Sequence, residues 1–307
     1  LRRGTTRYSD MEQLSRRMDE LYGAAVEPVV RRIGEIQCIG FYGSFPEPDY
    51  LPGGEALLGD TCALMAQLLL DPVTRGGLLL PQYVDSEREK LLDIIRSRMN
   101  DKRSYALTRC IEEMCCYEDF AVSRFGSESE AENIHYKKLT RHYRELIQTC
   151  PVEIFYCGKT DFKAVSAAMR DAFSAMPRGA IDYDIGTDLR MNAVEDHVRF
   201  VEEEMDVTQG KLVLGFRLGE CMEEPDIPAL YVFNAVYGSG TTSKLFMNVR
   251  EKLSLCYYAS SAVYLHKGIM LVSSGIEFDK LDAARDEILA QLDSVRRGEI
   301  TDDELRS

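Results

Sequence analysis

An arginine and a tyrosine seven positions apart are the residues best suited to chemistry in this sequence. Arg250 lies near the end of an expected helix that starts at 241–243, and Tyr257 lies at the start of the strand expected to follow it. Both side chains donate hydrogen bonds, so together they are suited to hold the carbonyl of a bound peptide. The structural alternative is an ordinary ion pair for Arg250 and a half-buried sheet position for Tyr257.

Other chemistries have less support. Gly238 and Gly240 precede the helix, but a Walker loop ends in Gly-Lys-Ser/Thr, and here Ser243 comes before Lys244. No histidine has a second one four residues away, which a helical zinc motif needs. The four histidines are His135, His142, His197 and His266. The sequence as given therefore predicts no nucleotide loop, no metal ligands and no catalytic residues.

Composition excludes several partners. The 307 residues carry a net charge of −14, and 45% are hydrophobic, as in a globular protein long enough for two domains. Nucleic acids and anionic membranes require clustered basic residues, so neither is expected, whereas a neutral or cationic peptide is compatible. The chain has no run of about 18 apolar residues, and its first residues lack the apolar core of a signal peptide. The nine cysteines are scattered without a Cys-x-x-Cys pair, which predicts reduced core thiols in a cytoplasmic protein.

Helical and extended patterns alternate along the chain. The predicted helices are 10–23, 55–70, 82–101, 105–117, 133–148, 161–176, 227–237 and 281–296. The predicted strands are 28–33 and 37–43, which form a hairpin around Gly34, and 151–157, 199–205, 211–218 and 269–277. The Gly-, Pro- and Asp-rich segment 177–196 has no sustained period and is the expected linker.

The two halves share an order of elements. Gly4-Thr5-Thr6 is followed by a helix, a hairpin, a helix and the segment 83–87, and Gly240-Thr241-Thr242 is followed by the same series and 300–304. This order predicts an internal repeat with one copy per domain. The second copy begins with a strand pair and a helix that the first copy lacks. We therefore expect roughly forty equivalent residues upstream of residue 1, and a second copy that continues beyond residue 307.

The stretch NVREKLSLCYYASS, with Arg250 and Tyr257 in it, resembles the insulinase-like family of zinc metallopeptidases, which includes pitrilysin and the mitochondrial processing peptidases. The resemblance implies an α+β fold of two homologous domains, each a mostly antiparallel sheet with helices packed on one face. The domains are expected at 1–185, without its N-terminal part, and at 197–307, without its C-terminal part. The resemblance also implies that Arg250 and Tyr257 bind substrate.

The family's inverted zinc motif, His-x-x-Glu-His, belongs to a helix that the resemblance places before residue 1. The family's third zinc ligand is a glutamate that lies seven residues after another functional glutamate. The earlier position matches Glu89 here, and the position of the zinc ligand matches Arg96. An arginine cannot replace a carboxylate as a zinc ligand. The chain thus resembles most the bacterial YmfF-like members of the family, which lack the zinc motif. We therefore expect that it binds no cofactor.

Three functions remain open. The first is a noncatalytic peptide-binding or regulatory subunit, whose partner is a peptide or protein and a homologous insulinase-like subunit or a second copy of itself. The second is a fragment of an active zinc-dependent endopeptidase, with its motif upstream and its third carboxylate supplied elsewhere, such as by Glu112 or Glu113. The third is a structural interaction domain in which Arg250 and Tyr257 belong to a local network.

Overall fold

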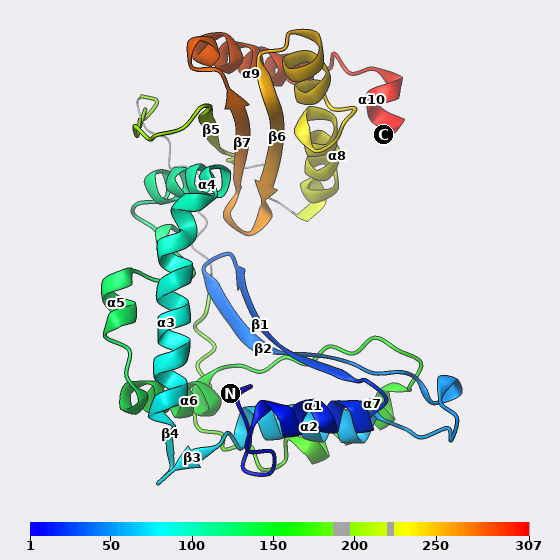
Figure 1. The fold of residues 1–307 in the computed structure, drawn as a ribbon. Helices are drawn as coiled ribbons and strands as arrows, with labels where there is room; N and C mark the ends of the chain where they lie inside the picture. The colour runs from blue at the N-terminus through cyan, green and yellow to red at the C-terminus, as the bar shows by residue number, and fades with distance from the viewer. Residues whose placement is uncertain (187–196, 220–223, 307) are drawn as a thin grey trace. The chain divides into compact units, whose positions relative to one another are not determined.

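The computed structural model describes residues 1–186, 197–219 and 224–306. The fold is α+β, and every sheet in these residues is antiparallel, as the sequence predicted. The chain forms two compact units (Figure 1), one from residues 1–95 and 125–186 and the other from 96–124 and 187–307. The chain last enters the second unit after Gly186, within the expected linker. The second unit also contains 96–124, which we expected in the first domain.

The first unit is built on the predicted hairpin. Strands β1 (Ala25–Ile33) and β2 (Ile36–Ser44) pair in register from Ala25 opposite Ser44 to Ile33 opposite Ile36. This register leaves a two-residue loop, and Gly34 takes a φ of 58° in it, a left-handed conformation that glycine adopts without strain. The sequence placed the hairpin correctly because the turn residue and the β-branched runs indicate the same arrangement.

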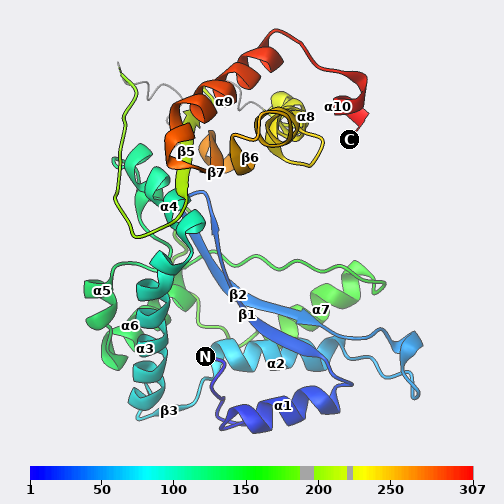
Figure 2. The same ribbon diagram turned by 45° about the horizontal axis from the view of Figure 1, so that its top comes forward.

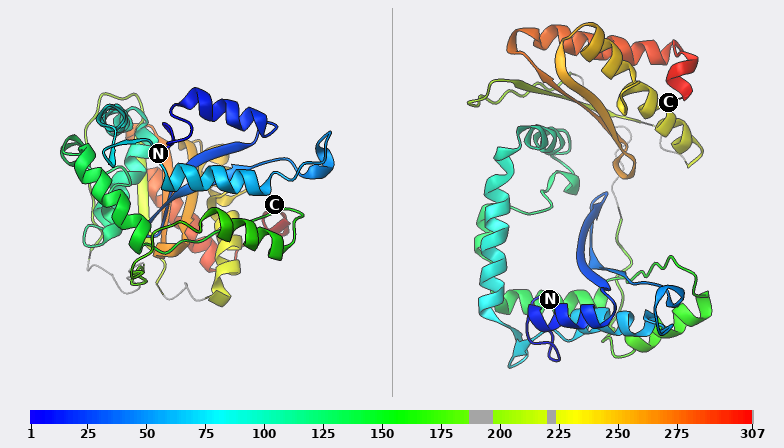
Figure 3. Two further views of the ribbon diagram at one scale, coloured as in Figure 1. Left: turned by 90° about the horizontal axis from the view of Figure 1, so that it is seen from below. Right: turned by 45° about the vertical axis from the view of Figure 1, so that its right-hand side comes forward.

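Two helices cover one face of this hairpin (Figure 3), α1 (Met11–Glu20) and α2 (Leu58–Leu70). Apolar residues from both helices and from β1 form the core, including Leu14, Val26, Leu64 and Leu68. Asp10 begins α1 by accepting a hydrogen bond from the backbone N–H of Gln13 at 2.9 Å. The other strands and α-helices described in this unit are β3 (Thr74–Arg75), β4 (Leu78–Leu79), α3 (Pro81–Ser97, whose last two residues belong to the second unit), α5 (Glu128–Glu132), α6 (Tyr136–Thr149) and α7 (Phe162–Ala172).

The second unit contains a three-stranded sheet in the order β5-β7-β6 (Figure 2), and every residue of the central strand is buried. Its strands are β5 (Gly210–Arg217), β6 (Cys256–Tyr264) and β7 (Ile269–Ile276). One face packs against α8 (Ile227–Gly238), a π-helix (Leu245–Lys252) and α9 (Leu281–Arg296). Tyr237, Val249, Met270 and Ile288 meet in this core. A short helix, α10 (Asp302–Arg306), follows.

Helix α4 (Lys102–Met114) packs against the opposite face of the same sheet. A Cβ on Gly215 of β5 would lie 2.6 Å from the Met114 sulfur, so the glycine allows this close approach. The chain after α4 is held by Glu118, whose carboxylate pairs with Arg217 of β5 and with Lys267 between β6 and β7. These contacts explain why 96–124 belongs to the second unit.

Three expectations were wrong. Residues 151–157 and 199–205 are not strands, although each has the composition of one. In 151–157 the side chains of Val152, Ile154 and Phe155 are exposed, Phe155 by 87%, and no described segment pairs with 151–157 as a strand. A β-rich sequence becomes a strand only where a neighbour completes its hydrogen bonds. The cysteines are also not all core residues: of the eight described, all free, only Cys62 and Cys115 are buried. Cys221 lies outside the described residues, as do positions 187–196 of the expected linker.

Candidate functional site

Arg250 lies on the π-helix Leu245–Lys252, which the sequence had indicated only as a helix. A π-helix has wider turns than an α-helix because each N–H donates to the carbonyl five residues back. Here the Leu253 N–H donates to the carbonyl of Asn248 at 3.2 Å. The guanidinium carbon of Arg250 lies 4.5 Å from the ring centre of Phe246, and the side chain is 39% exposed. It forms an ion pair with Glu251 at 3.4 Å. π-helical turns are frequent at functional sites.

The backbone between the two predicted site residues is irregular. Ser254 has a φ of 49°, a left-handed conformation that costs a non-glycine residue free energy. Strand β6 then begins with a bulge: Cys256 pairs with Ile276 and Tyr258 with Gly275, so Tyr257 is the extra residue. The bulge lets Cys256 pack into the core while Tyr257 is 51% exposed. Irregular backbone of this kind persists where a function requires it more often than elsewhere.

Arg250 acts electrostatically on the first residue of β6. Burial raises the pKa of the Cys256 thiol, and a hydrogen bond to Ser274 and the positive charge of Arg250 oppose that rise. The guanidinium is therefore close enough to the start of the strand to influence the residue next to Tyr257. The direct approach of Arg250 to Tyr257, within a few ångströms, stays a prediction.

The described residues do not fit a zinc ion. Across 1–186, 197–219 and 224–306, no three His, Cys, Asp or Glu side chains gather as a metal site would require. All four histidines are exposed. Arg96, at the position expected for the third ligand, is exposed near the end of α3. Glu89, at the other matched position, lies 3.5 Å from Arg88.

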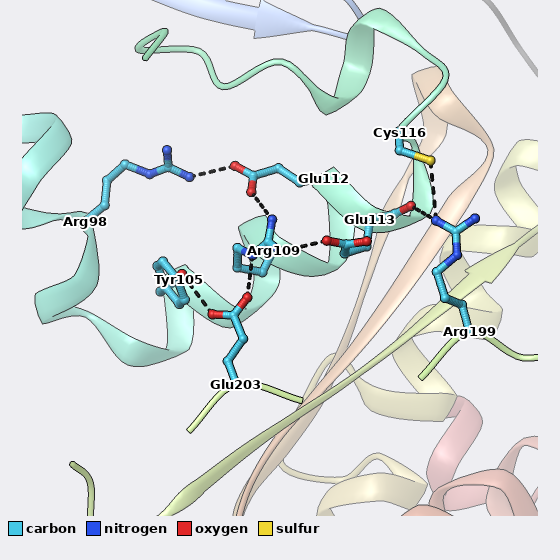
Figure 4. Close-up of polar contacts among 8 residues, drawn as sticks. All are labelled: Arg98, Tyr105, Arg109, Glu112, Glu113, Cys116, Arg199 and Glu203. Carbon is cyan, nitrogen blue, oxygen red and sulfur yellow. Dashed lines mark hydrogen bonds and ion pairs between the residues drawn. The ribbon is translucent and has the colours of Figure 1, made fainter. Parts of the chain in front are cut away.

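Glu112 and Glu113, the alternative carboxylates for zinc, are held by an arginine instead (Figure 4). Arg109 donates to Glu112 at 2.7 Å and to Glu113 at 2.6 Å, and its Nε donates to Glu203 at 2.7 Å. Arg98 also donates to Glu112. Carboxylates that accept from guanidinium groups in this way serve as structural ion pairs, and they tie the extended segment around Glu203 to α4. Sequence reasoning missed the link to Glu203, which is 94 positions from Arg109 in the chain.

A family model described as the peptidase M16 inactive domain matches residues 133–307. The probable inactive metalloprotease YmfF of Bacillus subtilis (strain 168) is 32% identical over 307 residues, which cover 99% of this chain and 71% of that protein. This chain belongs to the peptidase M16 family. The predicted insulinase-like resemblance is confirmed, and so is the coarser statement that the chain is a homologue of metallopeptidases. An uncharacterized zinc protease of Streptomyces coelicolor is 25% identical and is covered over 58% of its length.

Solved structures show the M16 fold independently. A conserved protein from Enterococcus faecalis V583 superposes with a TM-score of 0.84 at 24% identity, covering 99% of this chain and 71% of that one. The peptidase M16 inactive domain from Pseudomonas fluorescens gives a TM-score of 0.74 at 15% identity, covering 99% and 69%. None of the helices in the described part of the M16 chain is long and apolar enough to cross a membrane.

Proposed function

We propose that this M16 protein is a noncatalytic subunit that binds an extended peptide at Arg250 and Tyr257 and works in the cytoplasm beside a homologous subunit or a second copy of itself. The observation that carries the proposal is the irregular backbone around the two residues. A π-helix holds Arg250, a left-handed Ser254 follows it, and a bulge turns Tyr257 outward. Both side chains are partly exposed donors, suited to the carbonyl groups of a peptide lying along β6, an edge strand of the described sheet.

Two observations support a noncatalytic role. The described residues lack a metal-ligand cluster, and the relative with 32% identity is described as probably inactive. The competing function is an active zinc endopeptidase whose zinc motif lies upstream of residue 1. Metal analysis of the full-length protein after dialysis distinguishes the two functions. We expect well below one zinc per chain, whereas stoichiometric zinc that resists dialysis would favour the peptidase.

The proposed internal repeat has support in each unit separately. In the first unit Arg3, next to Gly4, pairs with Glu87 at 2.5 Å. In the second unit Lys244, which follows the matching Gly-Thr-Thr, pairs with Glu304 at 3.0 Å. Glu87 and Glu304 occupy the same place in the two series of elements. In each copy the corresponding glutamate thus pairs with a cation next to the Gly-Thr-Thr segment, Arg3 before it in the first copy and Lys244 after it in the second.

Arg250→Ala tests the binding role. The probe is a fluorescein-labelled peptide of alternating apolar and neutral polar residues, and its Kd is measured by anisotropy. A charge-assisted hydrogen bond contributes about 1.5 to 3 kcal/mol, so the Kd should rise roughly tenfold or more. The Tm should hardly change, because an exposed ion pair contributes about 0 to 1 kcal/mol.

The matched control is Arg285→Ala on α9, since Arg285 is 38% exposed and also lies beside acidic side chains. Its Kd should match that of the wild type. A large loss of stability in Arg250→Ala with unchanged peptide affinity would instead assign Arg250 and Tyr257 to the scaffold.

A further inference from the structure

A second group of polar side chains lies on the α4-facing side of the sheet in the second unit. Lys211 of β5, Gly275 of β7 and Tyr258 of β6 are directly opposite one another across the three strands. A Cβ on Gly275 would lie 2.5 Å from Cε1 of Tyr258, so the tyrosine ring occupies the space above the glycine. The Tyr258 hydroxyl accepts a hydrogen bond from Ser273 at 3.4 Å. The ring is thereby fixed on the sheet as a rigid platform.

Two cations converge on this platform. The guanidinium carbon of Arg103, from the first turn of α4, lies 4.2 Å from the centre of the Tyr258 ring, and the Lys211 ammonium lies 5.9 Å from it. Arg103 also donates to the Ser260 hydroxyl at 2.9 Å, which fixes the direction of its planar group. Cation–π contacts of this kind orient a cation without neutralising its charge.

Neither cation forms an ion pair with a carboxylate among the described residues, although the chain carries a net charge of −14. The charge of Arg103 adds to the Ser104 hydrogen bonds that lower the pKa of Asp101, without a direct contact between the two side chains. Lys211 donates to the neutral amide of Gln209 at 3.0 Å. The nearby acids are engaged elsewhere: Asp101 accepts from the backbone N–H groups of residues 103 and 104, and Glu203 accepts from Tyr105 and Arg109. Arg103 is exposed and Lys211 is half-buried, so both can be reached by a ligand.

We infer that Arg103, Lys211 and Tyr258 form a binding site for a carboxylate of a peptide. The inference rests on the proposed peptide-binding function and specifies the charge of the peptide. A carboxylate matches the planar fork of a guanidinium and takes a second contact from the ammonium. Either a glutamate side chain or the C-terminal carboxylate of a peptide has this chemistry.

The test compares labelled peptides of one sequence at low ionic strength. One peptide has a glutamate and a free C-terminus; a second has glutamine instead; a third has an amidated C-terminus. The wild type should bind the first peptide about tenfold more tightly than one of the other two. Weaker binding of the glutamine peptide would show that the glutamate side chain is bound, and weaker binding of the amidated peptide would show that the C-terminal carboxylate is bound. Arg103→Gln and Lys211→Gln should each bring that ratio close to one, whereas the control Arg296→Gln, at a side chain 75% exposed on α9, should preserve it.

Equal affinity of the wild type for all three peptides, or an unchanged ratio in both variants, would overturn the carboxylate site and leave peptide binding at Arg250 intact. The absence of binding by any peptide would contradict the proposed function itself. Competition by inorganic phosphate at concentrations where acetate has no effect would also overturn the inference, because the site would then select a tetrahedral anion.

Discussion

Lys267 Nζ lies 2.7 Å from Oε2 of Glu118, and both side chains are almost completely buried. Arg217 pairs with the other oxygen of the same carboxylate. Burying charges costs free energy, which the pairing recovers only while all partners are present. The three residues connect the chain after α4 to two places on the sheet, so this cluster anchors 96–124 in the second unit.

Glu118→Gln should therefore destabilise the protein by about 3 to 5 kcal/mol at pH 7, because it leaves two buried cations without their carboxylate. Burial raises the pKa of Glu118, but the hydrogen bond from Arg217 and the ion pair with Lys267 outweigh it and hold the pKa below its usual 4.5. A carboxyl with a lowered folded pKa adds stability above about pH 4.5 and loses it as the pH falls through the folded value.

Urea unfolding at pH 7 and pH 3 measures both effects. The wild type should lose more stability on acidification than Glu118→Gln does. The control, Glu277→Gln, removes an exposed pair with Lys280 and should cost less than about 1 kcal/mol. Parallel pH profiles for the wild type and Glu118→Gln would show that Glu118 does not titrate as described.

Gly275→Ala should displace the Tyr258 ring. The new methyl group would overlap Cε1 of Tyr258, and overpacking of this kind costs about 1 to 3 kcal/mol. Gly240→Ala is the matched control, since the nearest atom to its Cβ would be 3.9 Å away. Chemical denaturation gives both values. A Gly275→Ala protein as stable as the control would mean that the ring does not lie over the glycine.

Arg109→Met should loosen the extended segment 197–206. The substitution retains much of the side-chain length but removes the bonds to Glu203, Glu112 and Glu113. If the lost contacts contribute about 1 kcal/mol, proteolysis within this segment should become roughly fivefold faster. Mass spectrometry of the fragments locates the cuts, and Arg296→Met is the control. An unchanged cleavage rate would indicate that other contacts hold the segment.

Local features were predictable from the sequence, and features that depend on distant partners were not. The β1–β2 hairpin was predicted because Gly34 and the flanking strands are adjacent in the chain. The assignment of 96–124 to the second unit depends on contacts such as Glu118 with Arg217, which are 99 positions apart. The strand expected at 151–157 failed for the same reason, because composition does not reveal whether a neighbouring strand exists.

The candidate site shows the same division. Arg250 and Tyr257 were identified from their spacing and their resemblance to family members, and the structure adds that both are partly exposed. The bulge that separates Tyr257 from Tyr258 was not visible in the sequence, since two consecutive tyrosines fit a regular strand equally well. The bulge places Tyr258 opposite Gly275, and so the group around Arg103 could not be predicted.

We propose that Arg250 and Tyr257 together hold one peptide. The most direct test is a double-mutant cycle of peptide Kd values for Arg250→Ala, Tyr257→Phe and the double variant, with the neutral labelled peptide. Residues that bind the same ligand group should show a coupling energy of about 0.5 to 3 kcal/mol. We predict that each single variant weakens binding and that the double variant is weakened by clearly less than the sum. Strictly additive losses, or unchanged affinity in both single variants, would show that Arg250 and Tyr257 do not hold the same peptide group.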